Sequence, residues 1–161
     1  MSVRMVDIGG KDEVVRAARA EGVIKLSPST IKLIREGKIE KGDVFTVSKI
    51  AAISAVKKTP ELLPLCHNIP ITHVDVAIEI LGEDGVRVET VVKTVARTGV
   101  EMEALVGTTT ALLTVWDMVK KYEKTEEGQY PHTRIEYVRV IEKVKEVGGS
   151  SRSPEPRILG R

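Results

Sequence analysis

The sequence predicts an α+β fold with an antiparallel sheet, and three observations support this prediction. Residues 71–80 alternate apolar and polar side chains, which is typical of a half-buried strand. The turn sequence GEDG at 82–85 follows directly and leads into VRVETVVKTVA, so the two apolar runs are expected to form a hairpin. Residues 100–121 then carry apolar side chains with one Gly and no Pro, which predicts one long helix.

The first 27 residues contain sequence signals for a short helix and a short strand. Asp12 precedes the sequence VVRAARA in the manner of an N-cap, so a helix is expected at residues 12–20. On such a helix Arg16 and Arg19 would share a face. The sequence VIKLS at 23–27 is a short strand candidate.

Two further helices are expected before the hairpin. Pro28 opens the first of them and Gly37 closes it. Asp43 can cap the second, because apolar residues recur at helical spacing over residues 44–58. A last strand covers residues 134–147. The predicted order is that of a ferredoxin-like split βαβ layer with extra N-terminal helices.

Length and composition predict one domain. The 161 residues are 42% hydrophobic and 30% charged, which is enough apolar material for a sizeable core and excludes wholesale disorder. We expect a single domain at residues 1–147. Gly, Ser and Pro dominate residues 148–161, so this stretch is expected to be a mobile tail.

Charge and cysteine content exclude several classes of protein. Lys and Arg number 25 against 23 Asp and Glu, so no global field attracts nucleic acid. One cysteine, Cys66, excludes an internal disulfide framework and a multi-cysteine metal site. Neither a signal peptide nor a membrane-spanning run is recognisable, so we expect a cytoplasmic protein without nucleic-acid or membrane partners. Scarce Asn and Gln beside abundant Lys and Glu indicate a thermophile.

Cys66 and His67 end the sequence LPLCH, which a short loop would present just before the hairpin. One interpretation is acid/base chemistry or a phosphate contact through His67. The other is a buried Cys beside a hydrogen-bonded loop His. The dipeptide alone favours the second interpretation, because catalytic Cys and His are normally neighbours in space and not in sequence.

The stretch from residue 93 to 105 places two cations, two hydroxyls, a Gly and two carboxylates at a strand-to-helix junction. Backbone N–H groups at such a junction can hold an anion. However, Glu101 and Glu103 in the first turn of a helix are also what stabilisation of the helix dipole predicts. The two interpretations are evenly matched.

Asp117, Lys120 and Lys41 are further candidates. Asp117 and Lys120 are three residues apart on the long helix and can meet, although most such pairs are ordinary surface ion pairs. Lys41 precedes Gly and Asp at a helix start, where its ammonium could meet a phosphate or a leaving group. A solvated loop lysine is the alternative that composition favours.

Five segments occur in a characteristic order and spacing: MVDIGGKDEVVRAARAEG, KGDVFTVSKIAAISAVKKT, LLPLCHNIPITHVDV, ARTGVEMEAL and LLTVWDMVKK. Together they resemble the MoaC family of molybdenum cofactor biosynthesis, over nearly the whole chain up to about residue 147. The sequence departs from the family pattern at residues 121–135. The resemblance implies a ferredoxin-like subunit and a hexamer, a trimer of dimers with the active site at a subunit interface.

The resemblance also implies a reaction, that of a phosphorus–oxygen lyase. MoaC enzymes convert 3′,8-cyclo-7,8-dihydro-GTP into cyclic pyranopterin monophosphate and release pyrophosphate. By motif position the catalytic residues are Asp117, Lys120, Lys41 and His67. The substrate-binding residues are Leu65, Cys66, His67, Glu101, Met102, Glu103 and Arg16. No cofactor is expected, and no metal ligand is assigned.

Two other functions remain open at this point. A non-catalytic ferredoxin-like module could bind nucleotides or RNA, but RNA-reading sheets need exposed aromatic residues and this chain has only one Phe, three Tyr and one Trp. In a purely structural oligomer the charged positions would be incidental.

The predicted long helix also raises the question of which subunit supplies each site residue. Glu103 and Asp117 are 14 residues apart on it, which is roughly 21 Å. Either an extended substrate spans the two residues, or Lys41 or His67 of a two-fold-related copy completes the group around Asp117, and we expect the second arrangement.

Overall fold

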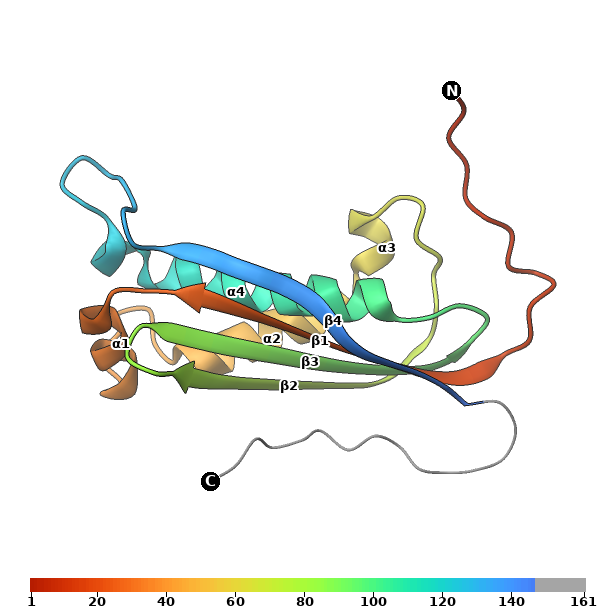
Figure 1. Cartoon of the computed structure of the whole chain (residues 1–161), viewed down its shortest axis with the longest axis horizontal. Coiled ribbons are helices and arrows are strands. Elements are labelled where there is room, and N and C mark those ends of the chain that lie inside the picture. The colour runs from red at the N-terminus through yellow and green to blue at the C-terminus, as the bar shows by residue number, and fades with distance from the viewer. Residues whose placement is uncertain (147–161) are drawn as a thin grey trace.

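The computed structural model describes residues 1–146, which form one four-stranded sheet and four helices (Figure 1). In chain order these elements are β1 (Val14–Lys25), α1 (Pro28–Arg35), α2 (Val44–Lys57), α3 (Thr59–Leu62), β2 (Ile71–Leu81), β3 (Gly85–Ala96), α4 (Glu101–Glu123) and β4 (Arg134–Glu146). No helix in this part of the chain is both long and apolar enough to span a membrane. The tail expected at 148–161 lies outside the described residues.

The sheet has the strand order β2-β3-β1-β4, and all neighbouring strands are antiparallel. β1 therefore lies between β3 and β4, the two strands that α4 connects in sequence, as in a ferredoxin-like layer. The predicted α+β fold class is confirmed. The predicted hairpin is present as β2 and β3, and Val74, Val76 and Ile78 of β2 face the core as their alternation predicts.

The expected helix at 12–20 is wrong, because residues 14–20 belong to β1 and residues 12 and 13 are not helical. Ala and Arg favour helices, but Ala18 and Ala20 pack in the core next to Ala104 of α4, and pairing with two strands overrides local propensity. The expected common face of Arg16 and Arg19 is wrong for the same reason, since residues three apart in a strand point to opposite faces.

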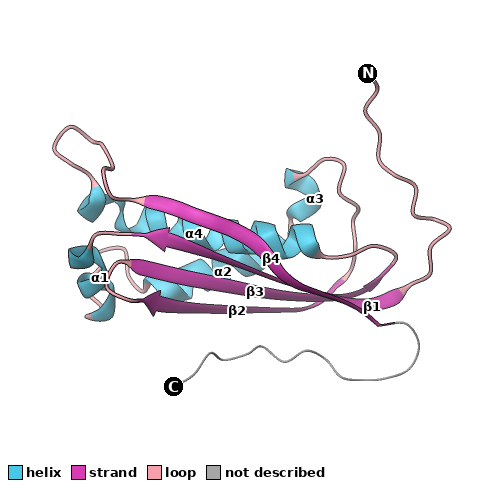
Figure 2. Ribbon diagram, in the orientation of Figure 1, coloured by secondary structure: helices cyan, strands magenta, loops and turns pink. Residues whose placement is uncertain are grey.

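α2 and α4 cover one face of the sheet and enclose the core (Figure 2). Leu112 and Val115 of α4 are fully buried in one cluster with Val88 of β3. Gly22 of β1 lies at a close approach of helix and sheet. A Cβ atom at Gly22 would lie 2.7 Å from a methyl carbon of Leu112 and 2.8 Å from the backbone oxygen of Tyr137.

The opposite face of the sheet carries a charged network. Glu21 of β1 accepts hydrogen bonds from Arg87 of β3 and Arg139 of β4, the shortest in each case at 2.6 Å. Burial by itself raises the pKa of Glu21, but these bonds outweigh it and hold the pKa below its ordinary value. Arg19 and Glu89 add an ion pair at 3.2 Å. The network links three neighbouring strands.

The helix starts follow the predicted signals. α1 begins at Pro28. The side chain of Asp43 accepts hydrogen bonds from the backbone N–H groups of Phe45 at 3.0 Å and Thr46 at 3.1 Å, so Asp43 is the N-cap of α2 as expected.

The end of α4 is tied to the start of α1 and to the loop that follows it. The buried carboxylate of Glu123 accepts a hydrogen bond from the backbone N–H of Ser27 at 2.9 Å. The backbone N–H of Glu40 donates to the hydroxyl of Tyr122 at 2.9 Å. These contacts hold the α1–α2 loop, which carries Lys41, against the last turns of α4.

Candidate functional site

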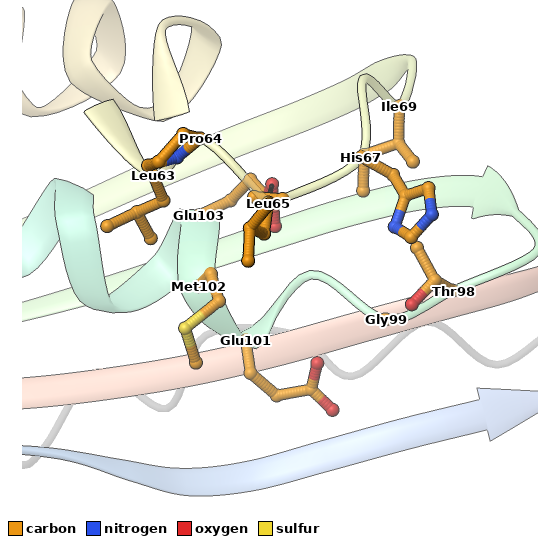
Figure 3. Close-up of a pocket in the computed structure, with 11 residues that line it drawn as sticks. Leu63, Pro64, Leu65, His67, Ile69, Thr98, Gly99, Glu101, Met102 and Glu103 are labelled. Carbon is orange, nitrogen blue, oxygen red and sulfur yellow. Dashed lines mark hydrogen bonds between the residues drawn. The ribbon is translucent and has the colours of Figure 1, made fainter. Parts of the chain in front are cut away.

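The first group of candidate residues surrounds a pocket of about 490 Å³ at the N-terminal end of α4 (Figure 3). The loop that follows α3 forms one wall, and the turn before α4 with its first helical residues forms the other. In Figure 3, Leu65 points toward the first turn of α4, and His67 lies toward the turn that carries Thr98. The lining residues are Leu63, Pro64, Leu65, Cys66, His67, Ile69, Thr98, Gly99, Glu101, Met102 and Glu103.

Glu103 is the buried carboxyl group of this pocket. It is 1% exposed, and the thiol of Cys66 donates to its Oε2 at 3.8 Å. Burial raises the pKa of Glu103, and the nearby carboxylate of Glu101 adds to the effect. Burial also raises the pKa of the Cys66 thiol, to which Glu103 contributes. The thiol of Cys66 therefore stays neutral more readily, and the carboxyl group of Glu103 is protonated more readily, than the same groups in water.

Glu101 and Arg16 lie on the other side of the same helix start. Burial alone raises the pKa of Glu101, but the ammonium of Lys143 at 2.9 Å outweighs it and holds the pKa below its ordinary value. Arg16 donates to the backbone oxygens of Ala96 at 3.2 Å and Arg97 at 3.3 Å, so it anchors the end of β3. Arg16 thus lies beside the turn that leads into the pocket.

His67 contacts the N-terminal segment of the chain. Its Nε2 lies 2.7 Å from the backbone oxygen of Val6. A carbonyl oxygen only accepts hydrogen bonds, so the imidazole donates from Nε2. His67 is therefore a hydrogen-bonded loop histidine, as the second interpretation of the sequence predicted. It also lines the pocket.

The second group of candidate residues lies near the other end of α4. The carboxylate of Asp117 accepts hydrogen bonds from Lys120 at 2.9 Å and from Lys41 at 3.1 Å. Lys41 also donates to the backbone oxygen of Asp117 at 3.0 Å. The hydrogen bond from Lys120, followed by that from Lys41, lowers the pKa of Asp117, and Asp117 in turn raises the pKa of Lys120. We refer to Lys41, Asp117 and Lys120 as the lysine–aspartate cluster.

The structure therefore brings the candidates together as two groups. The pocket and the lysine–aspartate cluster are roughly 21 Å apart along α4, measured from Glu103 to Asp117 at about 1.5 Å per residue. The expectation that another copy supplies Lys41 to Asp117 is wrong, since the α1–α2 loop of the same chain brings Lys41 into contact. His67 lies in the pocket, and the expectation that a second copy brings it to Asp117 stays a prediction.

Comparison with known proteins places the chain in a family. The model of the MoaC family matches residues 5–146, which span both groups of candidate residues. The chain belongs to the MoaC family. The resemblance found in the sequence is confirmed.

Three relatives of this MoaC protein come from the genus Pyrococcus. The protein of Pyrococcus abyssi is 63% identical over 143 residues, or 89% of each chain. That of Pyrococcus horikoshii is 62% identical over 143 residues and again 89% of each chain. That of Pyrococcus furiosus is 58% identical over 144 residues, or 89% of this chain and 92% of the relative. All three are named probable cyclic pyranopterin monophosphate synthase, and their thermophilic sources agree with the composition of this chain.

Sequence reasoning missed several residues that shape the pocket of this MoaC protein. Lys143 holds Glu101, and the backbone oxygen of Gly9 accepts a hydrogen bond at 3.0 Å from Arg97, which is itself one of the two cations of the predicted 93–105 stretch. Val6 contacts His67 through its backbone. A signal existed for the N-terminal residues, because MVDIGG is part of the first segment that resembles the family. No signal existed for Lys143, whose partner lies 42 positions earlier in the chain.

The described residues 1–146 contain no group of three or more His, Cys, Asp or Glu side chains arranged to hold a metal ion. The expectations that this MoaC protein needs no cofactor and no metal ligand remain predictions, as do the individual roles of the site residues.

Proposed function

We propose that this protein is a cyclic pyranopterin monophosphate synthase, which converts 3′,8-cyclo-7,8-dihydro-GTP into cyclic pyranopterin monophosphate and pyrophosphate. The observation that carries the proposal is its 63% identity, over 89% of each chain, to a relative of that name. The carboxylate of Asp117 between two lysines supports it.

The free thiol of Cys66 and a GTP-derived substrate support a cytoplasmic location.

The lysine–aspartate cluster supplies the groups that pyrophosphate release requires. A ribose hydroxyl attacks the α-phosphorus, the bond from that phosphorus to the oxygen bridging to the β-phosphate breaks, and the hydroxyl proton passes to a base. Lys41 and Lys120 carry the positive charge that stabilises the departing pyrophosphate. Asp117 has a lowered pKa and is therefore ionised near neutral pH, as a proton acceptor must be.

The pocket supplies groups suited to the ring system of the substrate. Leu65 and Met102 are exposed apolar side chains that offer surface to a flat heterocycle. Glu103 is a buried carboxyl with a raised pKa, so it can donate as well as accept a proton while rings open and close. Cys66, His67 and Glu101 provide further polar groups in the pocket, and Arg16 holds the end of β3 beside it.

A complete site requires both groups, and one helix cannot bring residues roughly 21 Å apart to the same reacting atoms. We propose that the pocket of one subunit faces the lysine–aspartate cluster of a two-fold-related subunit, within a hexamer built as a trimer of dimers. The cluster is accessible to such a partner, because the Lys41, Asp117 and Lys120 side chains are 47%, 58% and 43% exposed.

Incubation of the purified protein with 3′,8-cyclo-7,8-dihydro-GTP tests the function. We expect pyrophosphate and cyclic pyranopterin monophosphate in equal amounts, and no product from GTP itself. Binding of the substrate without pyrophosphate release would overturn the proposal and support a nucleotide-binding module instead.

A further inference from the structure

The N-terminal arm, which we define as residues 1–13, is extended and leads into β1. Figure 1 shows it running along the end of the molecule where α3 and the start of α4 lie, and then away from the body. Met5 and Val6 are 48% and 69% exposed. The side chains of the arm therefore make little contact with the rest of the described chain, and its backbone makes the specific contacts.

Two side chains of the body hold the backbone of the arm. His67 Nε2 donates to the oxygen of Val6 at 2.7 Å, and Arg97 Nη1 donates to the oxygen of Gly9 at 3.0 Å. His67 belongs to the loop after α3, and Arg97 precedes Thr98 in the turn before α4. These two segments are the opposite walls of the pocket. The arm thus links the two walls.

A turn inside the arm fixes the spacing of these two backbone oxygens. The side chain of Asp7 accepts a hydrogen bond from the backbone N–H of Gly9 at 2.7 Å. The backbone N–H of Lys11 donates to the oxygen of Ile8 at 3.1 Å. Because residues 7–11 are tied to one another, the oxygens of Val6 and Gly9 are presented together and not independently.

The contact with Val6 decides which nitrogen of His67 is available for chemistry. In a neutral imidazole one nitrogen carries the proton and the other accepts. Since the oxygen of Val6 can only accept, the proton resides on Nε2 and the lone pair on Nδ1. A histidine held by a backbone carbonyl in this way also keeps its ring orientation, which is a common device at functional sites.

We propose that the N-terminal arm is a positioning element of the site. The backbone oxygen of Val6 holds His67 so that Nδ1 is the nitrogen offered to the substrate, and the contact of Arg97 with Gly9 keeps the arm in place. Val6 and Arg97 are thus positioning residues and His67 is the residue they act through. The inference rests on the proposed function only for the role of His67, because the contact itself is independent of catalysis.

The first test removes the arm or loosens it. We compare the full chain with a variant lacking residues 2–8, with Arg97→Ala and Arg97→Lys, and with Arg4→Ala as a control on the same arm. Truncation and Arg97→Ala should lower kcat by about 10-fold to 10²-fold with a smaller change in KM, since a displacement of about 1 Å can cost about 10²-fold. Arg97→Lys should restore part of the loss, and Arg4→Ala should match the full chain.

The second test combines the truncation with His67→Ala. If the arm acts through His67, truncation should not lower the activity of the His67→Ala protein any further. An equal loss of kcat in both backgrounds would overturn the proposal, because the arm would then act on something other than His67. Unchanged activity in both the truncated protein and Arg97→Ala would overturn it as well.

A third measurement separates this inference from the proposed function. Nitrogen-15 spectra of the histidine side chains should show a proton on Nε2 of His67 that exchanges slowly with water in the full chain, and rapidly after truncation or Arg97→Ala. A rapidly exchanging proton in the full chain would overturn the positioning role, whatever the activity. A slow proton in a chain without synthase activity would leave the contact standing and reject the function alone.

Discussion

Lys41 and Asp117 are 76 positions apart in the chain and lie in direct contact, with the ammonium 3.1 Å from the carboxylate and 3.0 Å from the backbone oxygen of Asp117. Lys120 occupies the other carboxylate oxygen at 2.9 Å. Both lysines are close to half exposed, so a phosphate group can reach them without displacing the core. From this relationship we expect a phosphate group of the substrate to bind the two lysines beside the carboxylate.

Single substitutions in the cluster should abolish most of the activity without unfolding the protein. Lys41→Ala, Asp117→Asn and Lys120→Ala should each lower kcat by about 10²-fold or more, because acid/base and charge-stabilising groups contribute that much. Lys121→Ala is the matched control, since Lys121 follows Lys120 on the same helix but pairs with Glu40. Pyrophosphate release gives the rate and circular dichroism reports the fold. Normal kcat in all three variants would contradict the assignment.

Mixing inactive subunits tests the shared site. Lys41→Ala retains the pocket and His67→Ala retains the cluster, so an equal mixture under conditions of subunit exchange should recover about one quarter of the parent activity. Half of the dimers are then mixed, and each mixed dimer has one intact site. Lys41→Ala mixed with Asp117→Ala should recover nothing, because both lack a working cluster. Activity that does not return, despite mixed dimers detected by mass spectrometry, would argue against a shared site.

Cys66 should matter far less than its neighbour His67. Burial, followed by the nearby Glu103, raises the pKa of the thiol, so Cys66 is protonated at neutral pH and is a poor nucleophile. We expect Cys66→Ala to retain most of the kcat and His67→Ala to lose most of it. The comparison uses the same pyrophosphate assay. A severe loss with Cys66→Ala, combined with inactivation by a thiol-alkylating reagent, would reveal a reactive cysteine instead.

Glu103→Gln should raise the stability of the protein and lower its activity. Burial raises the pKa of Glu103, so the unfolded chain ionises first as the pH rises, and the free energy of unfolding falls above the ordinary carboxyl range. Gln cannot ionise and avoids this loss. The variant should therefore have a higher Tm than the parent at about pH 8, a smaller difference at about pH 4, and a reduced kcat. A difference in Tm that does not change with pH would refute the burial argument.

Gly22→Ala tests the close approach of α4 to the sheet. The added Cβ would lie 2.8 Å from the backbone oxygen of Tyr137, which cannot rotate away, and 2.7 Å from Leu112. Overpacking of this kind should lower the free energy of unfolding by about 1–3 kcal/mol, measured by denaturant titration. Gly10→Ala is the control, since nothing lies within 4 Å of its added Cβ. Equal stability of the two variants would contradict the packing argument.

Local sequence signals determined a large part of this protein. The hairpin, the N-cap of Asp43 and the length of α4 were predictable, because turn residues, caps and apolar periodicity act over a few positions. The contact of Asp117 with Lys120 was predictable for the same reason, since three positions on a helix bring two side chains together. The motifs of the MoaC family added the candidate residues of the pocket.

Only the tertiary structure decided the rest. Residues 12–20 have helical propensity, yet β3 and β4 pair with residues 15–20 on both sides and make them part of an inner strand of the sheet. Lys41 meets Asp117, and Val6 meets His67, across 76 and 61 positions of chain. No local pattern encodes such contacts, because they arise when packing against a common core closes long loops. The division of the site into a pocket and a cluster at opposite ends of α4 follows from that packing.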